Sequence, residues 1–355
     1  STNFRIINMI FNMTSSLPSQ SITVEKDIIV FSVQDTHESW SPNKHSEEII
    51  VDLSEKLSKN YRVFIFGNVI EGIYNGIEYF KQKHLLEFSN NYKIHTLIVC
   101  NDSQNLLYLP NIDRVLLWIY NNNTILSHYL QYHQIKLKKI ICNSQYQIDK
   151  IKNQYNIPSE YFSIYYNNVC FNNINTEITN NIEKIDYRFI YSGDIYKGLG
   201  NVLEMLPKIK EIFPKTTLYI YTDNNLPTHL QKIVDKLDYI FMNDMLSNDK
   251  LLIEYQKSDI WLYPTNISET FCENAVISQL ANCLCVTTTV GSLSEMIINK
   301  GITMDGNAND VTIQNKMINK IKFVLNNPNI KSNLITKANK YSKNILLNND
   351  INIFL

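Results

Sequence analysis

The side chains best placed for chemistry are two carboxylates in the second half of the chain, Glu269 and Glu295, each beside a predicted helix start. Glu269 follows an apolar strand, Ile260–Tyr263, that Pro264 ends, and it precedes a helix that begins near Cys272. Helix N-termini bind phosphates through their unpaired N–H groups, whereas carboxylates suit sugar hydroxyl groups. The combination indicates a nucleotide-sugar site. In a second interpretation, Glu269 only caps the helix, which contributes about 0.3–1 kcal/mol.

The segment that follows repeats this arrangement. The helix is predicted to run to about Ala281, and Asn282 follows where a left-handed cap residue is needed, Asn being the next choice after Gly. A second apolar strand, Leu284–Thr287, then leads through a loop with Gly291 to the helix start beside Glu295. Two helix N-termini therefore point to one edge of a parallel sheet. Glu295 is open to the same two interpretations as the first carboxylate.

A glycine-rich loop between a strand and a helix lies earlier in the chain. It holds three of the nine glycines, Gly193, Gly198 and Gly200, although average usage predicts about 25 glycines at this length. Glycines let the backbone approach a ligand, and Lys197 is placed to neutralise a phosphate at the helix start. Because glycine-rich loops are weak motifs, an ordinary loop with a solvated lysine is an equally open interpretation.

The first half of the chain offers a loop that runs into a helix. We predict that Trp40, His45 and Ser46 line the acceptor side of a cleft, opposite Lys197. Ser46 is also a good N-cap residue with Glu48 close behind it, so capping alone explains the pattern too. His45 is a candidate acid or base by its location only, and a surface histidine is the simpler interpretation.

Strands alternate with helices along most of the chain, an order typical of a parallel, doubly wound sheet. A polar, Asn-rich stretch without periodicity, Asn167–Asp186, separates two such sets and is predicted to be a linker. The expected fold class is α/β, with two Rossmann-like domains that face a cleft. The expected parts are an N-terminal acceptor-side domain (1–170), a linker (171–186), a C-terminal nucleotide-sugar-binding domain (187–330) and a C-terminal helix (331–355).

Composition limits the possible partners. The formal net charge of -1 over 355 residues gives no electrostatic reason to expect nucleic acid or an anionic membrane. No apolar run approaches the ~20 residues of a membrane span, and residues 1–20 lack the features of a secretory signal, so a cytoplasmic location is expected. The six cysteines form no CxxC pair, and no Asp-x-Asp motif is evident, so we expect neither disulfides nor a metal site. The chain ends look unlike natural termini, which indicates a module of a longer polypeptide.

In the order and spacing of these segments, the chain resembles retaining glycosyltransferases of the two-Rossmann (GT-B) architecture, family 4, over nearly its whole length. The resemblance is strongest over residues 187–295. Tyr191–Leu199 resembles the family's donor-phosphate segment. Ser258–Phe271 resembles the stretch in which a Pro precedes Glu-x-Phe, and Gly291–Glu295 resembles its Gly-Gly-x-x-Glu stretch.

The resemblance implies that the C-terminal domain binds a nucleoside-diphosphate sugar and that the last helix crosses back to the N-terminal domain. As the catalytic residues, Lys197 would contact the diphosphate and Glu269 the transferred sugar. The implied reaction moves a hexosyl group with retention, without a metal ion or other cofactor, to a glycan, protein or small-molecule acceptor. The implied donor-binding residues also include Gly193, Gly198, Arg188, Thr270, Phe271, Cys272, Glu273 and Glu295.

Several positions depart from the family pattern. The family's second acid falls on Ile277, its Arg before the Lys has no equivalent nearer than Arg188, and its His-Asp pair falls on Tyr120 and Asn121. The family Gly after the helix becomes Asn282. These departures leave a second class of function open, a catalytically inactive nucleotide- or sugar-binding module of a larger protein.

Glu273 is a candidate replacement for the missing acid. It lies one turn before Ile277, and residues i and i+4 share a helix face with Cβ atoms about 5–6 Å apart. Glu273 either takes over contact with the ribose hydroxyl groups or is a favourable first-turn residue that faces solvent. The sequence leaves both interpretations open.

Overall fold

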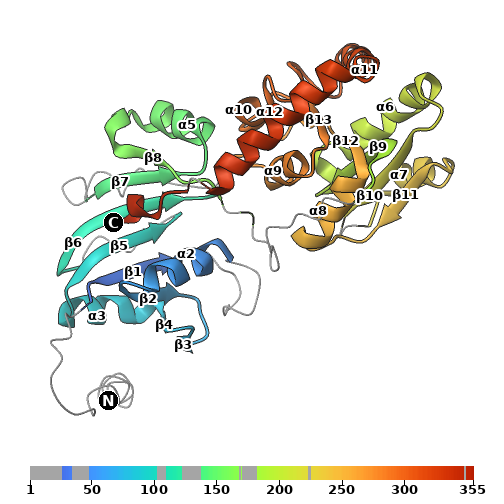
Figure 1. Ribbon diagram of the computed structural model, residues 1–355. Helices are drawn as coiled ribbons and strands as arrows, with labels where there is room; N and C mark the ends of the chain where they lie inside the picture. The colour runs from blue at the N-terminus through green and yellow to red at the C-terminus, as the bar shows by residue number, and fades with distance from the viewer. Residues whose placement is uncertain are drawn as a thin grey trace.

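The computed structural model describes residues 26–33, 48–101, 109–121, 137–167, 169, 182–222, 225–347 and 349–355. Within these ranges the chain forms two open sheets flanked by helices, one in each half of the chain (Figure 1). The expectation of an α/β fold with two Rossmann-like units is confirmed.

The described part of the N-terminal sheet has the strands β1 (Ile28–Val33), β2 (Arg62–Gly67), β3 (Gly72–Tyr74), β4 (Ile77–Lys81), β5 (Ile94–Cys100), β6 (Ile112–Ile119), β7 (Leu137–Cys142) and β8 (Phe162–Ile164). Their order is β3-β4-β2-β1-β5-β6-β7-β8, and every neighbouring pair except β3 and β4 is parallel. The helical segments are α2 (Glu48–Ser58), η2 (Gln82–His84), α3 (Leu85–Asn91), α5 (Gln145–Tyr155) and η3 (Ser159–Tyr161). Helix α2 buries its apolar residues on one face of the sheet, whereas α3 and α5 bury theirs on the other.

The C-terminal sheet has the strands β9 (Ile185–Ser192), β10 (Thr217–Tyr221), β11 (Ile240–Asn243), β12 (Ser258–Tyr263), β13 (Leu284–Thr288) and β14 (Ile302–Met304). Their order is β11-β10-β9-β12-β13-β14, and all neighbouring pairs are parallel. The helical segments are η4 (Ile195–Lys197), α6 (Leu199–Ile212), α7 (Thr228–Val234), α8 (Asn248–Lys257), α9 (Glu273–Leu280), α10 (Leu293–Ile297), α11 (Val311–Leu325), α12 (Pro328–Leu347) and η5 (Ile351–Phe354).

The C-terminal sheet reverses its direction of winding between β9 and β12. The chain runs outward from β9 through β10 to β11, returns to β12 beside β9, and continues through β13 to β14. At such a switch point the loops that follow the two strands diverge, and ligands of open α/β sheets bind in the crevice at the strands' carboxyl ends. The loop after β9 contains Lys197, and the loop after β12 contains Glu269. The topology therefore brings both predicted catalytic residues to one edge.

Strand β12 lies at the centre of this sheet, and all of its residues are buried, as expected for a parallel strand covered on both faces. The predicted strand Ile260–Tyr263 is extended at its start by Ser258 and Asp259. The Asp259 carboxylate forms an ion pair with Lys331 at 2.5 Å and accepts a hydrogen bond from the Tyr187 N–H, while the Ser258 hydroxyl donates to the Glu254 carbonyl. The partners of Asp259, which lie far away in the sequence, compensate for the burial of a carboxylate at the start of β12.

A hairpin between β3 and β4 is absent from the elements predicted from sequence periodicity. Asn75 and Gly76 form its two-residue turn with φ values of +50° and +78°. Both central residues of a type I′ turn need positive φ, and Asn-Gly is the strongest local signal for it. The two strands are too short to be predicted from periodicity. The Asn-Gly dipeptide is the local signal that could have predicted the hairpin.

The region predicted as a linker differs at its C-terminal end. Strand β9 begins at Ile185, which pairs with Ser258 of β12, so Ile185 and Asp186 belong to the sheet. Residues 170–181 of that region lie outside the described residues. The predicted acceptor-side residues Trp40, His45 and Ser46 lie outside them as well.

The chain passes between the two halves at two adjacent points. Tyr166, which leaves the N-terminal half, and Asn349, which re-enters it, exchange hydrogen bonds of 3.0 and 2.8 Å. Helix α12 packs on α9, where Asn339 donates to the carbonyl groups of Gln279 and Leu280. The turn η5 then brings the C-terminal residues back to the N-terminal sheet (Figure 1).

The side chain that anchors this return is Phe354. It is fully buried, and its ring makes edge contacts with Trp118 and Tyr165 at centroid distances of 5.2 and 5.0 Å. The N-terminal core therefore depends on residues from the opposite end of the chain.

Phe354→Ala should lower the free energy of unfolding by about 3–5 kcal/mol, because it leaves a cavity beside Trp118 and Tyr165. Urea denaturation followed by tryptophan fluorescence measures this loss. Leu347→Ala is the matched control, since Leu347 is 79% exposed and its truncation should change stability by less than about 0.5 kcal/mol. Equal stability of the two variants would show that η5 does not support the N-terminal core.

Candidate functional site

An ion pair connects the two loops that meet at the switch point. The Lys197 ammonium lies 2.9 Å from one carboxylate oxygen of Glu269, and the Tyr263 hydroxyl donates to the other at 2.7 Å. Burial by itself lowers the pKa of Lys197, but attraction to Glu269 and their hydrogen bond raise it above its usual value. Burial also raises the pKa of Tyr263, so its hydroxyl stays a donor. The site thus presents a fixed cation and a fixed anion side by side.

Two glycines allow neighbouring loops to approach the loop of Glu269. At Gly198, where φ is +115°, a Cβ atom would lie 2.5 Å from the carbonyl oxygen of Pro264. At Gly291, where φ is +59°, it would lie 2.6 Å from the carbonyl oxygen of Glu269. The sequence suggested that the glycines of the β9–α6 loop let the backbone approach a ligand; in the structure, Gly198 and Gly291 each make room for the backbone of a neighbouring loop. Gly193 differs, since among the described residues its Cβ position has one neighbour within 4 Å, the Asn274 side chain.

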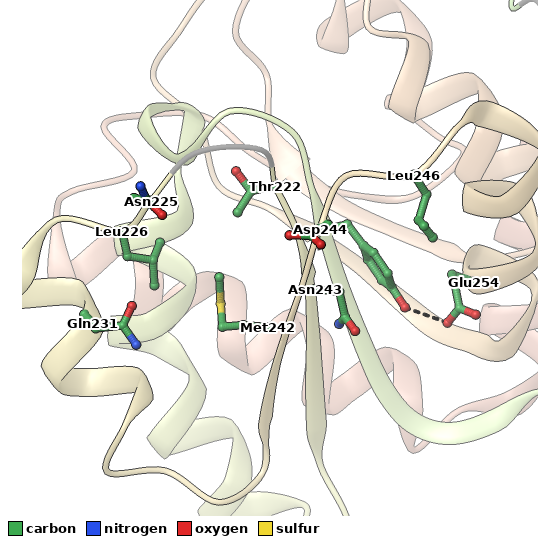
Figure 2. A pocket seen from close by; sticks show the side chains of 10 residues that line it. Thr222, Asn225, Leu226, Gln231, Met242, Asn243, Asp244, Leu246 and Glu254 are labelled. Carbon is green, nitrogen blue, oxygen red and sulfur yellow. Dashed lines mark hydrogen bonds between the residues drawn. The ribbon is translucent and has the colours of Figure 1, made fainter.

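A pocket with a volume of about 720 Å³ adjoins this loop system at the carboxyl ends of β10 and β11. The Gly193 N–H donates to the carbonyl of Tyr221, so the glycine loop is bonded directly to the pocket wall. Figure 2 shows the polar and apolar side chains that surround the space. The pocket is lined by Tyr221, Thr222, Asn225, Leu226, Gln231, Met242, Asn243, Asp244, Leu246 and Glu254.

Arg188, predicted to bind the donor beside Lys197, supports the pocket wall instead. Its guanidinium group is buried, pairs with Glu254 and stacks on the Tyr219 ring at 3.7 Å. Tyr221 also donates to Glu254, at 2.7 Å. Burial by itself raises the pKa of Glu254, but hydrogen bonds from Lys257, Tyr221 and Arg188 lower it below its usual value. Arg188 lies in the middle of β9 and therefore cannot substitute for an arginine in the loop that follows.

The N-terminus of α9 carries most of the other predicted donor-binding residues. Thr270, Phe271 and Cys272 are buried, and Cys272 is the N-cap residue without a side-chain capping bond. Glu273 is exposed at the first helical position, where the helix dipole favours a carboxylate. Ile277 is only 1% exposed and packs in the C-terminal core. The position of the family's second acid is therefore an apolar core position here.

Glu295 contacts the N-terminal half of the chain. Its carboxylate accepts hydrogen bonds from the backbone N–H groups of Gln145 and Tyr146, at 3.2 and 3.0 Å. Burial raises the pKa of Glu295, and these two donors oppose only part of the rise. Tyr120 and Asn121, which replace the family's His-Asp pair, lie behind the same interface, where their carbonyl groups accept bonds from Asn143 and Gln147.

The sequence analysis missed all the residues that line the pocket, as well as three residues around Glu269: Tyr263, Asn143 and Tyr146. Tyr263 is the last residue of the predicted strand and immediately precedes Pro264. A hydroxyl group at that strand end could have identified it as a site residue. Asn143 and Tyr146 contact the Glu269 loop from the N-terminal half, and nothing in their local sequence indicates it.

Two findings on the described residues concern metal ions and membranes. They contain no group of three or more His, Cys, Asp or Glu side chains arranged to hold a metal ion. No helix in the described part of the chain combines the length and hydropathy that a bilayer crossing requires.

Gly198→Ala should disrupt the site by forcing the β9–α6 loop away from Pro264. The strained φ and the backbone clash together should cost at least about 1–3 kcal/mol of stability, measured by thermal unfolding. Gly200→Ala is the matched control: Gly200 lies in α6 and its Cβ position has one neighbour at 4.0 Å. That variant should be neutral or more stable by up to about 1 kcal/mol. Similar stability of both alanine variants would rule out the close approach at Gly198.

Comparisons with known proteins agree with this architecture. Residues 186–327 match the family model for glycosyl transferases group 1. No curated protein sequence matches the chain significantly. A glycosyltransferase from Rickettsia africae superimposes with a TM-score of 0.68 at 16% identity, over 93% of this chain and 96% of that one. Anabaena HepE in complex with UDP gives 0.66 at 12% identity, over 92% and 97% of the two chains.

Further HepE structures contain UDP with glucose, and UDP-glucose. Sucrose-phosphate synthase from Thermosynechococcus elongatus superimposes with a TM-score of 0.60 at 11% identity, over 90% of this chain and 95% of that one. At such identities, structural likeness establishes the fold alone. The chain therefore has the GT-B fold of these glycosyltransferases, and the part of it that carries Lys197, Glu269 and Glu295 matches a glycosyltransferase family model.

Proposed function

We propose that the protein is a retaining, metal-independent glycosyltransferase that moves a hexosyl group from a nucleoside-diphosphate sugar to an acceptor. The observation that carries this proposal is the Lys197–Glu269 pair at the switch point, between a glycine loop and two helix N-termini. A cation beside helix N-termini can stabilise a departing diphosphate without a divalent ion. A carboxylate beside it can accept hydrogen bonds from a sugar hydroxyl group.

The ion pair leaves both groups able to bind substrate. An ammonium group has three N–H donors, and Glu269 takes one of those of Lys197. Each carboxylate oxygen of Glu269 accepts one bond, from Lys197 or Tyr263, and keeps a second lone pair. A donor diphosphate can therefore share Lys197 with Glu269, and the sugar can lie across the carboxylate. No large rearrangement of either side chain is required.

The adjoining pocket is suited to the nucleoside of the donor. Amide side chains of Asn225, Gln231 and Asn243 can donate and accept hydrogen bonds, while Leu226 and Met242 offer apolar contact to a base. The pocket and the ion pair lie on neighbouring strands of one sheet edge, connected through Gly193. Because HepE structures contain UDP and UDP-glucose, these are the first ligands to test.

A second candidate function is nucleotide or sugar binding without catalysis. It is favoured by Ile277, which puts an apolar, buried side chain where relatives of the resembled family carry an acid. Incubation with a panel of nucleoside-diphosphate sugars discriminates the two. Hydrolysis or transfer supports the enzyme, whereas calorimetric binding without turnover supports the binding module.

Lys197→Ala should weaken binding of the nucleoside-diphosphate sugar about tenfold or more, because a lost charge-assisted contact costs about 1.5–3 kcal/mol. Isothermal titration calorimetry in the presence of EDTA measures this and tests metal independence. Lys208→Ala, on the exposed side of α6, is the matched control and should bind like the wild type. Strict dependence on magnesium or manganese, or equal affinity of all three proteins, would contradict the proposal.

Glu269→Gln should lower turnover by at least about 100-fold while the protein stays folded, since the amide keeps the shape but loses the charge that stabilises the transition state. Steady-state kinetics measure the loss, and NMR of the product anomer tests retention. Glu211→Gln, an exposed change on α6, controls for the loss of a charge alone. Turnover of Glu269→Gln at the wild-type rate would remove Glu269 from the mechanism.

A further inference from the structure

The loop of Glu269 is held on both sides by the N-terminal half of the molecule. The hydroxyl oxygen of Ser268, immediately before Glu269, lies 2.5 Å from that of Tyr146. Thr270, immediately after it, accepts a hydrogen bond of 3.2 Å from the side-chain amide of Asn143. Asn143 and Tyr146 flank the start of α5, which packs on the N-terminal sheet. Both neighbours of the proposed catalytic carboxylate are therefore fixed from across the interface.

The same end of α5 is bound by a carboxylate from the C-terminal half. The first N–H groups of a helix have no partner within it, and the dipole there favours negative charge. Ser144 caps one of them by accepting from the Gln147 N–H. Glu295 accepts from the two others, those of Gln145 and Tyr146. The N-terminus of α5 is thus completed only when the C-terminal half lies against it.

Glu295 and the Glu269 loop are also connected to each other. The Ser292 N–H donates to the Glu269 carbonyl at 2.9 Å, three residues before Glu295 in the chain. Gly291 packs against the backbone of Glu269 closely enough to exclude a Cβ atom. Helix α5, the Glu269 loop and the start of α10 therefore contact one another pairwise. Movement of α5 away from the C-terminal sheet would act on the loop directly.

We propose that Asn143, Tyr146 and Glu295 are positioning residues that fix the Glu269 loop only when the two domains meet. This inference rests on the proposed glycosyl transfer. With α5 docked, Ser268 and Thr270 are bonded and the carboxylate between them is held in place. With α5 withdrawn, both bonds are lost. Reacting groups tolerate little misplacement, since an error of about 1 Å can cost about 100-fold in rate. The site becomes competent in the closed arrangement.

A purely structural interface would behave differently. Loss of its hydrogen bonds would lower thermal stability and leave kcat of the folded protein unchanged. Positioning predicts a lower kcat with nucleotide affinity retained, because α5 does not line the pocket around Tyr221 and Asn243. The division between kcat and nucleotide affinity therefore separates the two explanations.

Tyr146→Phe and Ser268→Ala each remove one hydroxyl from the same contact, and the double variant completes a mutant cycle. With UDP-glucose as the first donor, each single variant should lower kcat about fivefold or more, the effect of one hydrogen bond. The kcat of the double variant should be no lower than that of the less active single variant. The Kd for UDP of each variant should stay within about twofold of the wild-type value. Tyr155→Phe is the control: its hydroxyl accepts from Gln154 beside it on α5, and kcat should be unchanged.

Glu295→Ala tests the domain arrangement without any activity. Small-angle X-ray scattering should give a larger radius of gyration for this variant than for the wild type. Unchanged scattering, a wild-type kcat in Tyr146→Phe, or additive losses in the double variant would each overturn the inference. If the wild type neither binds nor turns over any donor in the panel, glycosyl transfer itself fails. Scattering then still decides whether Glu295 holds the domains together.

Discussion

The loop between β12 and α9 is the constraint on which the rest of the site depends. Lys197 and Tyr263 bind the carboxylate of Glu269, and the backbone of this loop accepts close packing at Gly198 and Gly291. These contacts come from the ends of three strands of the same sheet, β9, β12 and β13. The loop therefore cannot move without disturbing the β9 loop, the β13 loop or both.

Close packing of backbone explains why these two glycines persist in a chain that is otherwise poor in glycine. The chain has nine glycines, and among the described residues six asparagines, Asn156 and Asn282 among them, adopt positive φ beside five glycines. Asparagine tolerates positive φ but still carries a Cβ atom. Where a Cβ atom would lie within 3 Å of a neighbouring backbone, only glycine fits. Packing distance, in addition to backbone angle, decides where glycine is kept.

The described contacts of the α5 start with the Glu269 loop and Glu295 are hydrogen bonds, which suits the proposed engagement and release of this loop. The hydrogen bonds that Asn143 and Tyr146 form with the Glu269 loop, and those that Glu295 accepts from α5, can be exchanged for bonds to water, whereas a large apolar interface would not separate so readily. The paired chain crossings at Tyr166 and Asn349 restrain the two halves at one point. In the proposed mechanism, the two halves rotate about these crossings while the α5 end engages or releases the Glu269 loop.

Local sequence patterns predicted much of the fold and several of the site residues. Alternating strands and helices predicted the α/β fold, and Ser144 and Asp310 cap the starts of α5 and α11. Asn282 takes the left-handed conformation that its place after a helix predicts. Glu269 and Lys197 were singled out because each stands in a loop between a strand and a helix. These signals extend over a few residues, so a single sequence carries them.

Only the tertiary structure decided which of these residues meet. Lys197 and Glu269 are 72 residues apart, and their pairing depends on β12 returning beside β9. Arg188 was assigned to the donor by proximity in sequence, yet the strand directs it to Glu254. Glu295 binds an N–H group 149 residues earlier in the chain. Strand order and domain docking arise from the sum of many weak, long-range contacts, and no short sequence pattern encodes that sum.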